Sequence, residues 1–486
     1  MPSPRLKRWV TTVAFVSLAL AVGAVPSRAD WEGAVDLSPV GTPSGVPCET
    51  GRPSVAASRD GSFLVAWQRK LDAQSNDNTL IEGRRIDRDG TVGPLLQLSD
   101  APANLGTVAT AVGPDGAGIV VWHRLPAGAC GVAPGPILLE ARRVGADGSM
   151  GPVTSVTEPS DKALDTSVVV HRSGDVTVAW VDQIGFDQSV LKVRQLPATG
   201  PPGPVFRLTP TLGTTEEVKL VVDQHDRTLA VWNQHGILQA QRLSPDGDPL
   251  PGVIDVTPVD DTSAELDVGI AANGQARVTW TRFSPLPITI LMRTIGADGT
   301  LGPIDVAADG QDRPLGGRVA VSPSGAAALV WFTSPSDPAA HDVAFGRTLS
   351  PTGALAPVVA LSGPGSGVDM MPHVTLADNG AAVAVWQRSL GETGVVEGAS
   401  FSARGAEGPA TQLSQPAQIE PFPDLDGNPK GDAVAAWGQQ TDGGNAMKIQ
   451  AAQFCRSPGN GNPKHSPCRR AGKPSSSPGA GAARRR

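Results

Sequence analysis

Eight tryptophans recur along the chain at a nearly constant interval, and this repeat limits the folds that the chain can adopt. The first, Trp67, and the last, Trp437, lie seven steps apart at a mean spacing of about 53 residues. The members between them are Trp122, Trp180, Trp232, Trp280, Trp331 and Trp386. A period of this length is typical of propeller blades and solenoid coils, whose repeats bury their apolar faces against one another.

Each repeat contains the pattern of four short strands. In the first repeat we expect the strands at residues 53–57, 63–67, 81–86 and 93–99. Asp-Gly pairs at 60–61 and 89–90 separate them, and this dipeptide adopts the left-handed backbone of a tight hairpin at little cost. The second strand, Phe-Leu-Val-Ala-Trp, is apolar on both sides, so neighbouring repeats must cover both of its faces.

The two ends of the repeat array are complementary. Residues 33–38 match the fourth-strand segment of other repeats, and no first three strands precede them. The last repeat ends with its third strand at residues 447–454 and lacks a fourth. An N-terminal strand that completes the last sheet closes a ring and removes an unpaired edge. We therefore predict an all-β, eight-bladed β-propeller of four-stranded antiparallel blades over residues 30–455, closed by the N-terminal strand.

The hairpin pattern Val-Ala, Asp-Gly, Val-Ala-Trp resembles the repeats of NHL-like and sialidase-like bacterial propellers over nearly all of residues 33–455. The motif implies the fold and no particular function. It departs from the sialidase Asp-box, because residues 58–61, Ser-Arg-Asp-Gly, lack the residue between Asp and Gly. Sialidases that resemble this fold use a tyrosine nucleophile, and the chain contains no tyrosine, which excludes that mechanism.

The segments outside the repeats predict export. Residues 1–29 place three basic residues before an apolar run and end in Ala29, as a secretory signal peptide does. No later segment approaches the roughly 20 apolar residues that a membrane span requires. Residues 456–486 form a basic Pro/Gly/Ser-rich tail that we expect to be disordered. We expect a secreted, extracellular monomer with no membrane span.

The net charge of the repeat region narrows the classes of partner that we expect. Residues 30–455 carry a formal net charge of −19 when the basic signal and tail are removed from the total of −7. Nucleic acid is therefore not an expected partner, because its binding requires a basic surface.

Four cysteines, Cys48, Cys130, Cys455 and Cys468, favour two disulfides, since no metal-ligand spacing accompanies them. Three pairings are possible, and we favour Cys48 with Cys130 and Cys455 with Cys468.

The loops after each repeat Trp vary in length and share one face of the predicted ring with the links between blades. Variable loops on a rigid frame are the usual place for a binding site. Two positions after the Trp, four equivalent arginines would grip an anion if they converged at the mouth of the channel. The candidate ligand-binding residues at this position are Arg69, Arg124, Arg282 and Arg388, with Asp182, Gln234 and Gln439. The alternative is that each arginine covers a blade edge and pairs with a local acid.

A second arginine series lies on the third strands, at Arg84, Arg142, Arg293 and Arg347, where we expect it to join blades or face solvent. The histidines and loop carboxylates show no catalytic or metal-binding spacing. We therefore predict no catalytic residue, no metal ligand and no cofactor.

The sequence favours an extracellular binding or scaffolding module that holds a polyanion, a glycan or a protein on the face bearing the post-Trp loops. A carbohydrate-active hydrolase or lyase, other than a Tyr-dependent sialidase, is the alternative. Whether the protein is an enzyme is left open by the sequence.

Overall fold

The computed structural model describes residues 30–39, 52–72, 75–128, 135–209, 212–259, 261–309, 313–334, 342–363, 368–418, 421–441 and 446–455. Within these ranges the regular structure consists of strands, and no helix is long and apolar enough to cross a membrane. The predicted signal peptide and basic tail lie outside the described residues and stay predictions.

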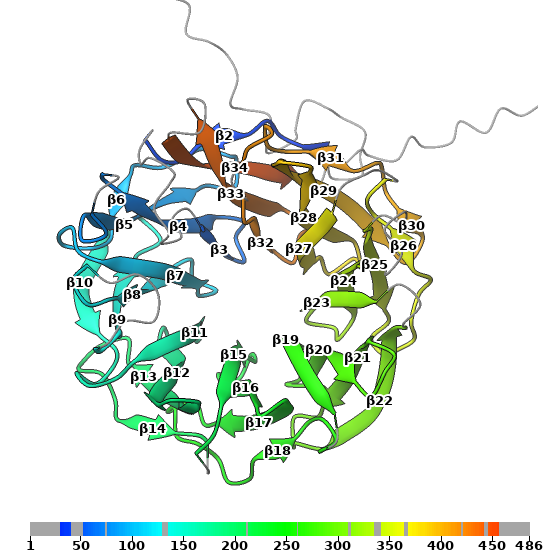
Figure 1. Cartoon of the computed structure of the whole chain (residues 1–486), viewed down its shortest axis with the longest axis horizontal. Helices are drawn as coiled ribbons and strands as arrows, with labels where there is room; N and C mark the ends of the chain where they lie inside the picture. Colours follow the sequence, from blue (N-terminus) through cyan, green and yellow to red (C-terminus); the bar gives the residue numbers. More distant parts are fainter. Residues whose placement is uncertain are drawn as a thin grey trace, which may run out of the picture.

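Eight antiparallel sheets follow one another around a central axis in the order of the sequence (Figure 1). In each blade the first strand lies beside the axis and the last strand lies at the rim (Figure 1). The predicted eight-bladed β-propeller is thereby confirmed.

The first four blades contain four strands each. Blade 1 comprises β3 (Ser54–Ala57), β4 (Phe63–Lys70), β5 (Thr79–Ile86) and β6 (Leu96–Gln97). Blade 2 comprises β7 (Leu105–Val112), β8 (Gly118–Arg124), β9 (Leu138–Val144) and β10 (Met150–Ser155). Blade 3 comprises β11 (Ala163–Val170), β12 (Val176–Gly185), β13 (Gln188–Leu196) and β14 (Val205–Arg207). Blade 4 comprises β15 (Thr215–Val222), β16 (Thr228–Gln234), β17 (Ile237–Leu243) and β18 (Ile254–Asp255).

The other four blades follow the same order, and in blades 7 and 8 the outermost strand is divided into two short pieces. Blade 5 comprises β19 (Thr262–Ile270), β20 (Ala276–Ser284), β21 (Thr289–Ile295) and β22 (Leu301–Ala308). Blade 6 comprises β23 (Pro314–Val321), β24 (Ala327–Thr333), β25 (Ala344–Leu349) and β26 (Val359–Ala360). Blade 7 comprises β27 (Val368–Leu376), β28 (Ala382–Leu390), β29 (Thr393–Ser402), β30 (Gly405–Ala406) and β31 (Thr411–Gln412). Blade 8 comprises β32 (Asp424–Gly427), β33 (Ala433–Thr441) and β34 (Ala446–Cys455), with β1 (Asp30–Trp31) and β2 (Val35–Asp36).

The N-terminal segment completes the last blade, as the sequence predicts. Val35 lies opposite Ala451 and Asp36 opposite Gln450 in an antiparallel pairing of β2 with β34. Ahead of it, β1 pairs with the end of the same strand, where the Trp31 ring meets the Phe454 ring edge-on at 5.3 Å. The ring is therefore closed by residues from its two ends, and the outer edge of β34 is paired.

Among the described residues the core is divided into eight apolar clusters, and each lies between two neighbouring blades. At the seam, Leu37 of the N-terminal segment, Trp67 of blade 1 and Val434 of blade 8 share one cluster. The second strands are apolar on both sides because each of their faces contributes to a different cluster. Close approach of blades also requires small residues, since a Cβ on Gly118 would lie 2.9 Å from the Leu64 side chain of blade 1.

The second arginine series joins the blades. On β5, Arg84 donates to the carbonyl of Leu37, and on β9, Arg142 donates to that of Leu98. Each acceptor belongs to the outer strand region of the preceding blade. Equivalent bonds run from Arg194 to Val156, from Arg293 to Val256 and from Arg347 to Ala307. The arginines predicted to join blades therefore do so, and Arg194 is a further member that the sequence analysis missed.

The described residues include one of the four cysteines. Cys455 is buried at the end of β34. Cys48, Cys130 and Cys468 lie outside the described residues, so the favoured pairing stays a prediction.

Candidate functional site

The strand order gives the ring two different faces. In every blade the Asp-Gly turns and their equivalents join the first strand to the second and the third to the fourth, on one face. The loops after each Trp and the links between blades lie on the opposite face. We call these the turn face and the loop face.

Three of the four candidate arginines pair with an acid of their own blade. Arg69 holds Glu82 through two bonds, with Nη2 2.6 Å from Oε1 and Nε 2.8 Å from Oε2. Arg124 binds Glu140 at 2.8 Å. The same geometry recurs in blade 7, where Arg388 lies 3.3 Å from Glu397. Each glutamate stands on the third strand directly opposite the repeat Trp, so the contact belongs to the repeat.

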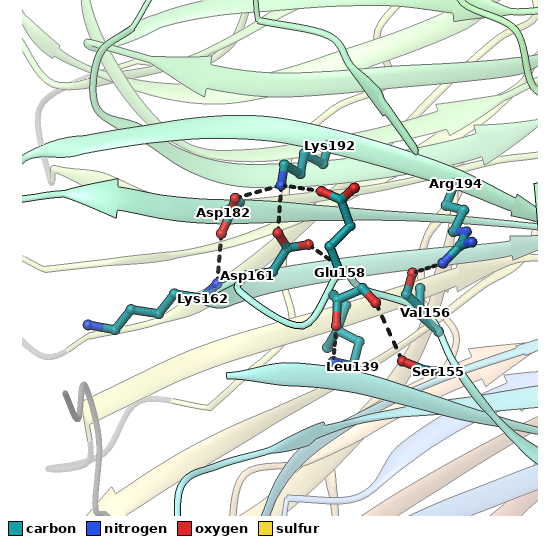
Figure 2. Close-up of polar contacts among 10 residues, drawn as sticks. Leu139, Ser155, Val156, Glu158, Asp161, Lys162, Asp182, Lys192 and Arg194 are labelled. Carbon is teal, nitrogen blue, oxygen red and sulfur yellow. Dashed lines mark hydrogen bonds and ion pairs between the residues drawn. The ribbon is translucent and has the colours of Figure 1, made fainter. Parts of the chain in front are cut away.

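Blade 3 carries the same pair with its charges exchanged. Asp182 occupies the arginine position and binds Lys192, which stands opposite the repeat Trp, at 2.9 Å. The ammonium of Lys192 also lies 2.6 Å from Asp161 and 3.2 Å from Glu158 (Figure 2). Burial opposes the charge, but the hydrogen bonds to Asp161 and Asp182 raise the pKa of Lys192 above its usual value. Three carboxylates thus share one ammonium, and backbone N–H groups also bind Asp161 and Asp182.

The remaining candidates, Gln234, Gln439 and Arg282, form no ion pair of the kind seen in blades 1, 2, 3 and 7 among the described residues. Gln234 and Gln439 are buried, and the side chain of Gln439 binds the backbone of Gln415. Across the described residues, Arg282 forms no ion pair with a carboxylate, and Leu291 stands opposite its repeat Trp. The seven candidates thus lie in seven different blades. Arg69, Arg124, Arg388 and Asp182 pair with a charged residue of their own blade. Anion binding by this set stays a prediction.

Carboxylates of the innermost strands form a second feature, which the sequence analysis missed. Asp165 accepts the N–H of Val218 in the next blade at 2.8 Å, and Asp267 accepts that of Val319 at 2.8 Å. The inner edge of these strands is not paired with another strand, and the side chains of the preceding blade accept some of its N–H groups. The alternating acids of the first strands are the sequence signal that could have revealed this role.

At the seam this arrangement produces two carboxyls with different proton affinities. Asp424 accepts the N–H of Val55 at 2.7 Å, and Asp426 accepts that of Ala57 at 2.8 Å. Burial raises the pKa of Asp426 to about 7. Burial acts on Asp424 too, but a contact of 3.2 Å with Nδ1 of His373 lowers its pKa below the usual value. Both carboxyls are engaged by the neighbouring blade, which indicates a structural role.

A groove between blades 5 and 6 is the strongest candidate for a binding site. It has a volume of about 310 Å³ and is lined by Trp331, Phe345, Arg347 and Asp309, among others. The Trp331 and Phe345 rings stack with their centroids 6.0 Å apart and their planes at 22°. Asp309 lies in the link between the blades and interacts electrostatically with Arg347. Aromatic faces beside a few fixed polar groups are typical of small-ligand sites.

The groove follows from a local departure from the repeat. Two positions after the Trp, blade 6 has Thr333, the shortest of the eight side chains, where four blades have arginine. Opposite the Trp it has Phe345. The other blades carry Glu82, Glu140, Lys192, Gln239, Leu291, Glu397 and Gln450 there. Blade 6 therefore lacks the polar pair beside its tryptophan, and the space remains open.

The loop face also exposes large apolar side chains. Phe186 at the tip of the β12–β13 hairpin is 91% exposed, Leu286 after β20 is 78% exposed and Val259 in the link between blades 4 and 5 is 76% exposed. Leu212, in the link between blades 3 and 4, is 51% exposed. Blades 3, 4 and 5 are consecutive in the ring, so these tips belong to one sector of the loop face.

No group of three or more His, Cys, Asp or Glu side chains suited to a metal ion occurs within the described ranges. No protein family matches the chain, and no curated protein matches it.

Solved structures with related folds do match. A prolyl endopeptidase studied for its inter-domain dynamics is 13% identical with a TM-score of 0.48, and the match covers 80% of this chain and 54% of that one. The NanB sialidase of Streptococcus pneumoniae is 11% identical over 73% of this chain and 67% of that one, with a TM-score of 0.40. The Dos1 propeller is 7% identical over 84% and 94%, with a TM-score of 0.45. The chain thus spans about half the length of the endopeptidase. At these identities the likeness concerns the fold alone.

Proposed function

We propose that the protein is an exported, extracellular binding module that holds a glycan in the groove between blades 5 and 6. The observation that carries the proposal is the stacked Trp331–Phe345 pair in the one blade that has a threonine two positions after its tryptophan. The half-buried Phe345 ring offers an apolar face to the C–H groups of a sugar ring, and the buried Trp331 ring packs against it. Arg347 and Asp309 supply a donor and an acceptor for hydroxyl groups in the same lining.

Binding is favoured over cleavage by the chemistry of the lining. Glycosidases with the usual mechanism need two carboxyl groups on either side of the scissile bond. Among the described residues that line the groove, Asp309 is the single carboxylate. A polyanion is a poorer ligand than a neutral glycan, because three of the four candidate arginines are already paired with glutamates.

The test converts blade 6 to the pattern of blades 1, 2 and 7. The double variant T333R/F345E places an Arg–Glu pair at the positions of blade 6 that are equivalent to Arg69 and Glu82 of blade 1. We expect this pair to fill the groove, because both positions line it. We expect the wild-type protein to retain members of a broad glycan panel, and the variant to bind them at least about tenfold more weakly. Every panel member is also assayed for cleavage products.

The matched control is Q234R/Q239E, which makes the same conversion in blade 4. We expect it to bind as the wild type does, because its blade has no groove lined by an aromatic pair. Equal binding by T333R/F345E and the wild type contradicts the proposal, as does the absence of any retained glycan. Release of cleaved product would point to the hydrolase or lyase instead.

A protein partner on the loop face is the second candidate, and the apolar tips of blades 3 to 5 favour it. Exposed apolar side chains gathered in one sector mark protein-docking surfaces. We expect a partner cross-linked to the wild type in culture medium to be lost with F186S/L286S and kept with T333R/F345E. If F186S/L286S also keeps the partner, the result argues against docking at these tips.

A further inference from the structure

A small hollow with an apolar wall lies on the turn face, at the ends of innermost strands. A cavity of about 280 Å³ lies where the innermost strands of blades 3 to 6 end. Its wall contains one aliphatic side chain from the end of each of those strands, namely Val170, Val222, Ile270 and Val321. Prolines of the neighbouring turns, such as Pro114 and Pro429, complete the wall. The hollow is separate from the groove of blades 5 and 6, and no residue lines both.

The acids in this wall are already engaged. Asp226 accepts the N–H groups of Arg172 at 2.6 Å and Ser173 at 3.3 Å, so both of its oxygens have donors. Asp223 binds the guanidinium of Arg227 at 2.6 Å and accepts further backbone N–H groups from its own turn. Arg227 therefore neutralises Asp223, whereas Asp226 is bound by backbone N–H groups and keeps its negative charge.

Two arginines in the wall are not engaged in this way. Arg59 from the blade 1 turn and Arg172 from the blade 3 turn both line the hollow, and both are exposed. In the part of the chain that the structure describes, neither guanidinium forms an ion pair or a side-chain hydrogen bond. The two guanidinium groups outweigh the one carboxylate of the wall that no cation neutralises, Asp226. The body of the protein carries −19 formal charges, so this hollow is a local exception.

We propose that this hollow binds a monocarboxylate that has an apolar body. The aliphatic side chains remove the body from water, and the guanidinium groups of Arg59 and Arg172 bind the carboxylate, for which their planar donor geometry is suited. Two sources offer this chemistry, a free aliphatic acid and the C-terminus of a peptide that ends in an aliphatic residue. The inference does not rest on glycan binding, which concerns different residues.

Calorimetric titration of the full chain with four probes tests the ligand class. Three of the probes are octanoate, acetate and octanol, and the fourth is a tetrapeptide ending in leucine that is supplied in two forms, as the free acid and as the amide. We expect octanoate or the peptide acid to bind, and acetate, octanol and the peptide amide to bind at least about tenfold more weakly. Octanoate binding without peptide binding identifies a free acid as the ligand, and the converse identifies a peptide C-terminus. Equal binding of acetate and octanoate would remove any role for the apolar wall.

The variant R59Q/R172Q tests the two cations. Both side chains are exposed, so we expect the variant to unfold at the wild-type temperature and to bind the successful probe at least about tenfold more weakly. R404Q removes an exposed arginine on the rim of blade 7 and is expected to change nothing. The proposal is overturned if R59Q/R172Q binds as the wild type does, or if neither octanoate nor the peptide acid binds at millimolar concentration. Glycan binding measured in parallel shows separately whether the groove is functional.

Discussion

At the scale of single residues, the contacts beside the repeat tryptophans differ mainly in how deeply their charges are buried. Arg124 and Glu140 form a pair whose arginine side chain is 51% exposed. The equivalent cluster of blade 3 places Lys192 against Asp161 and Asp182, whose side chains are 1% and 5% exposed. Water screens an exposed pair, whereas a buried carboxylate left without its cation keeps the full cost of desolvation.

Removal of the central cation of blade 3 should therefore be costly. We expect Lys192→Met to lower the free energy of unfolding by about 3 kcal/mol, since it leaves two buried carboxylates unpaired. Arg124→Met should cost less than about 1 kcal/mol, because its pair is open to solvent. Urea unfolding of both variants checks the difference, and equal losses would contradict the assignment of blade 3 as a buried network.

The seam carboxyl Asp426 predicts a pH dependence of stability. Its pKa is raised from 3.8 to about 7 by burial, so the folded state holds the proton more tightly than the unfolded chain does. The resulting stabilisation is complete below about pH 4 and is lost as the pH rises toward 7, by at most about 4 kcal/mol.

Asp426→Ser removes this titration and keeps a hydroxyl that can accept the N–H of Ala57. In urea unfolding between pH 4 and 8, we expect the free energy of unfolding to decline in the wild type. It should decline equally in the control Asp378→Ser, which changes a residue in an exposed turn. The serine variant at position 426 should lack this decline. The same slope in all three proteins would show that Asp426 titrates normally.

At the scale of strands, adjacent blades are joined by polar side chains as well as by their apolar faces. Arg293 on β21 donates to the carbonyl of Gly302 at 2.8 Å and to that of Val256, in the preceding blade, at 2.7 Å. Blades 7 and 8 have alanine at this position, Ala399 and Ala452, so the ring does not need the contact in every blade.

Loss of one such contact should weaken the ring without opening it. We expect Arg293→Ala to lower the free energy of unfolding by about 1 to 3 kcal/mol, because two carbonyls lose a charged donor. Arg293→Lys should recover little of this, since an ammonium cannot reproduce the planar fork that spans both acceptors. Thermal and urea unfolding check both variants, and a neutral Arg293→Ala would contradict the joining role.

The strands themselves could be predicted from the sequence, and their side-chain partners could not. The Asp-Gly turns and the Phe63–Trp67 pattern locate the hairpins of each blade, and both the strand order and the loop face follow from them. The partner of Arg124 depends on which third-strand residue stands opposite Trp122. This register cannot be found by counting residues from the Trp, because the loop between β8 and β9 differs in length from the β12–β13 hairpin. The groove of blade 6 was missed for the same reason, since it depends on Phe345 meeting Trp331.

At the scale of the whole molecule, ring closure sets the positions of both proposed sites. The groove and the turn-face hollow are each built from more than one blade, and seven blades contribute to the hollow. An array that stayed open at blade 8 would expose β34 and would lose the contacts that Asp424 and Asp426 make with blade 1. Closure depends on two short strands, of which β2 also contributes the ion pair of Asp36 with Lys448 at 2.8 Å.

A disulfide engineered across this pairing tests closure most directly. Asp36 and Gln450 stand opposite each other, with the Gln450 amide 2.7 Å from the Asp36 carboxylate, and facing residues of antiparallel strands lie within disulfide reach. We expect D36C/Q450C to form an intramolecular bond, located by peptide mapping in a monomer, and D36C/Q412C, aimed at the neighbouring blade, to form none. A D36C/Q450C protein that stays reduced, or that links only between two chains, would contradict the closed ring.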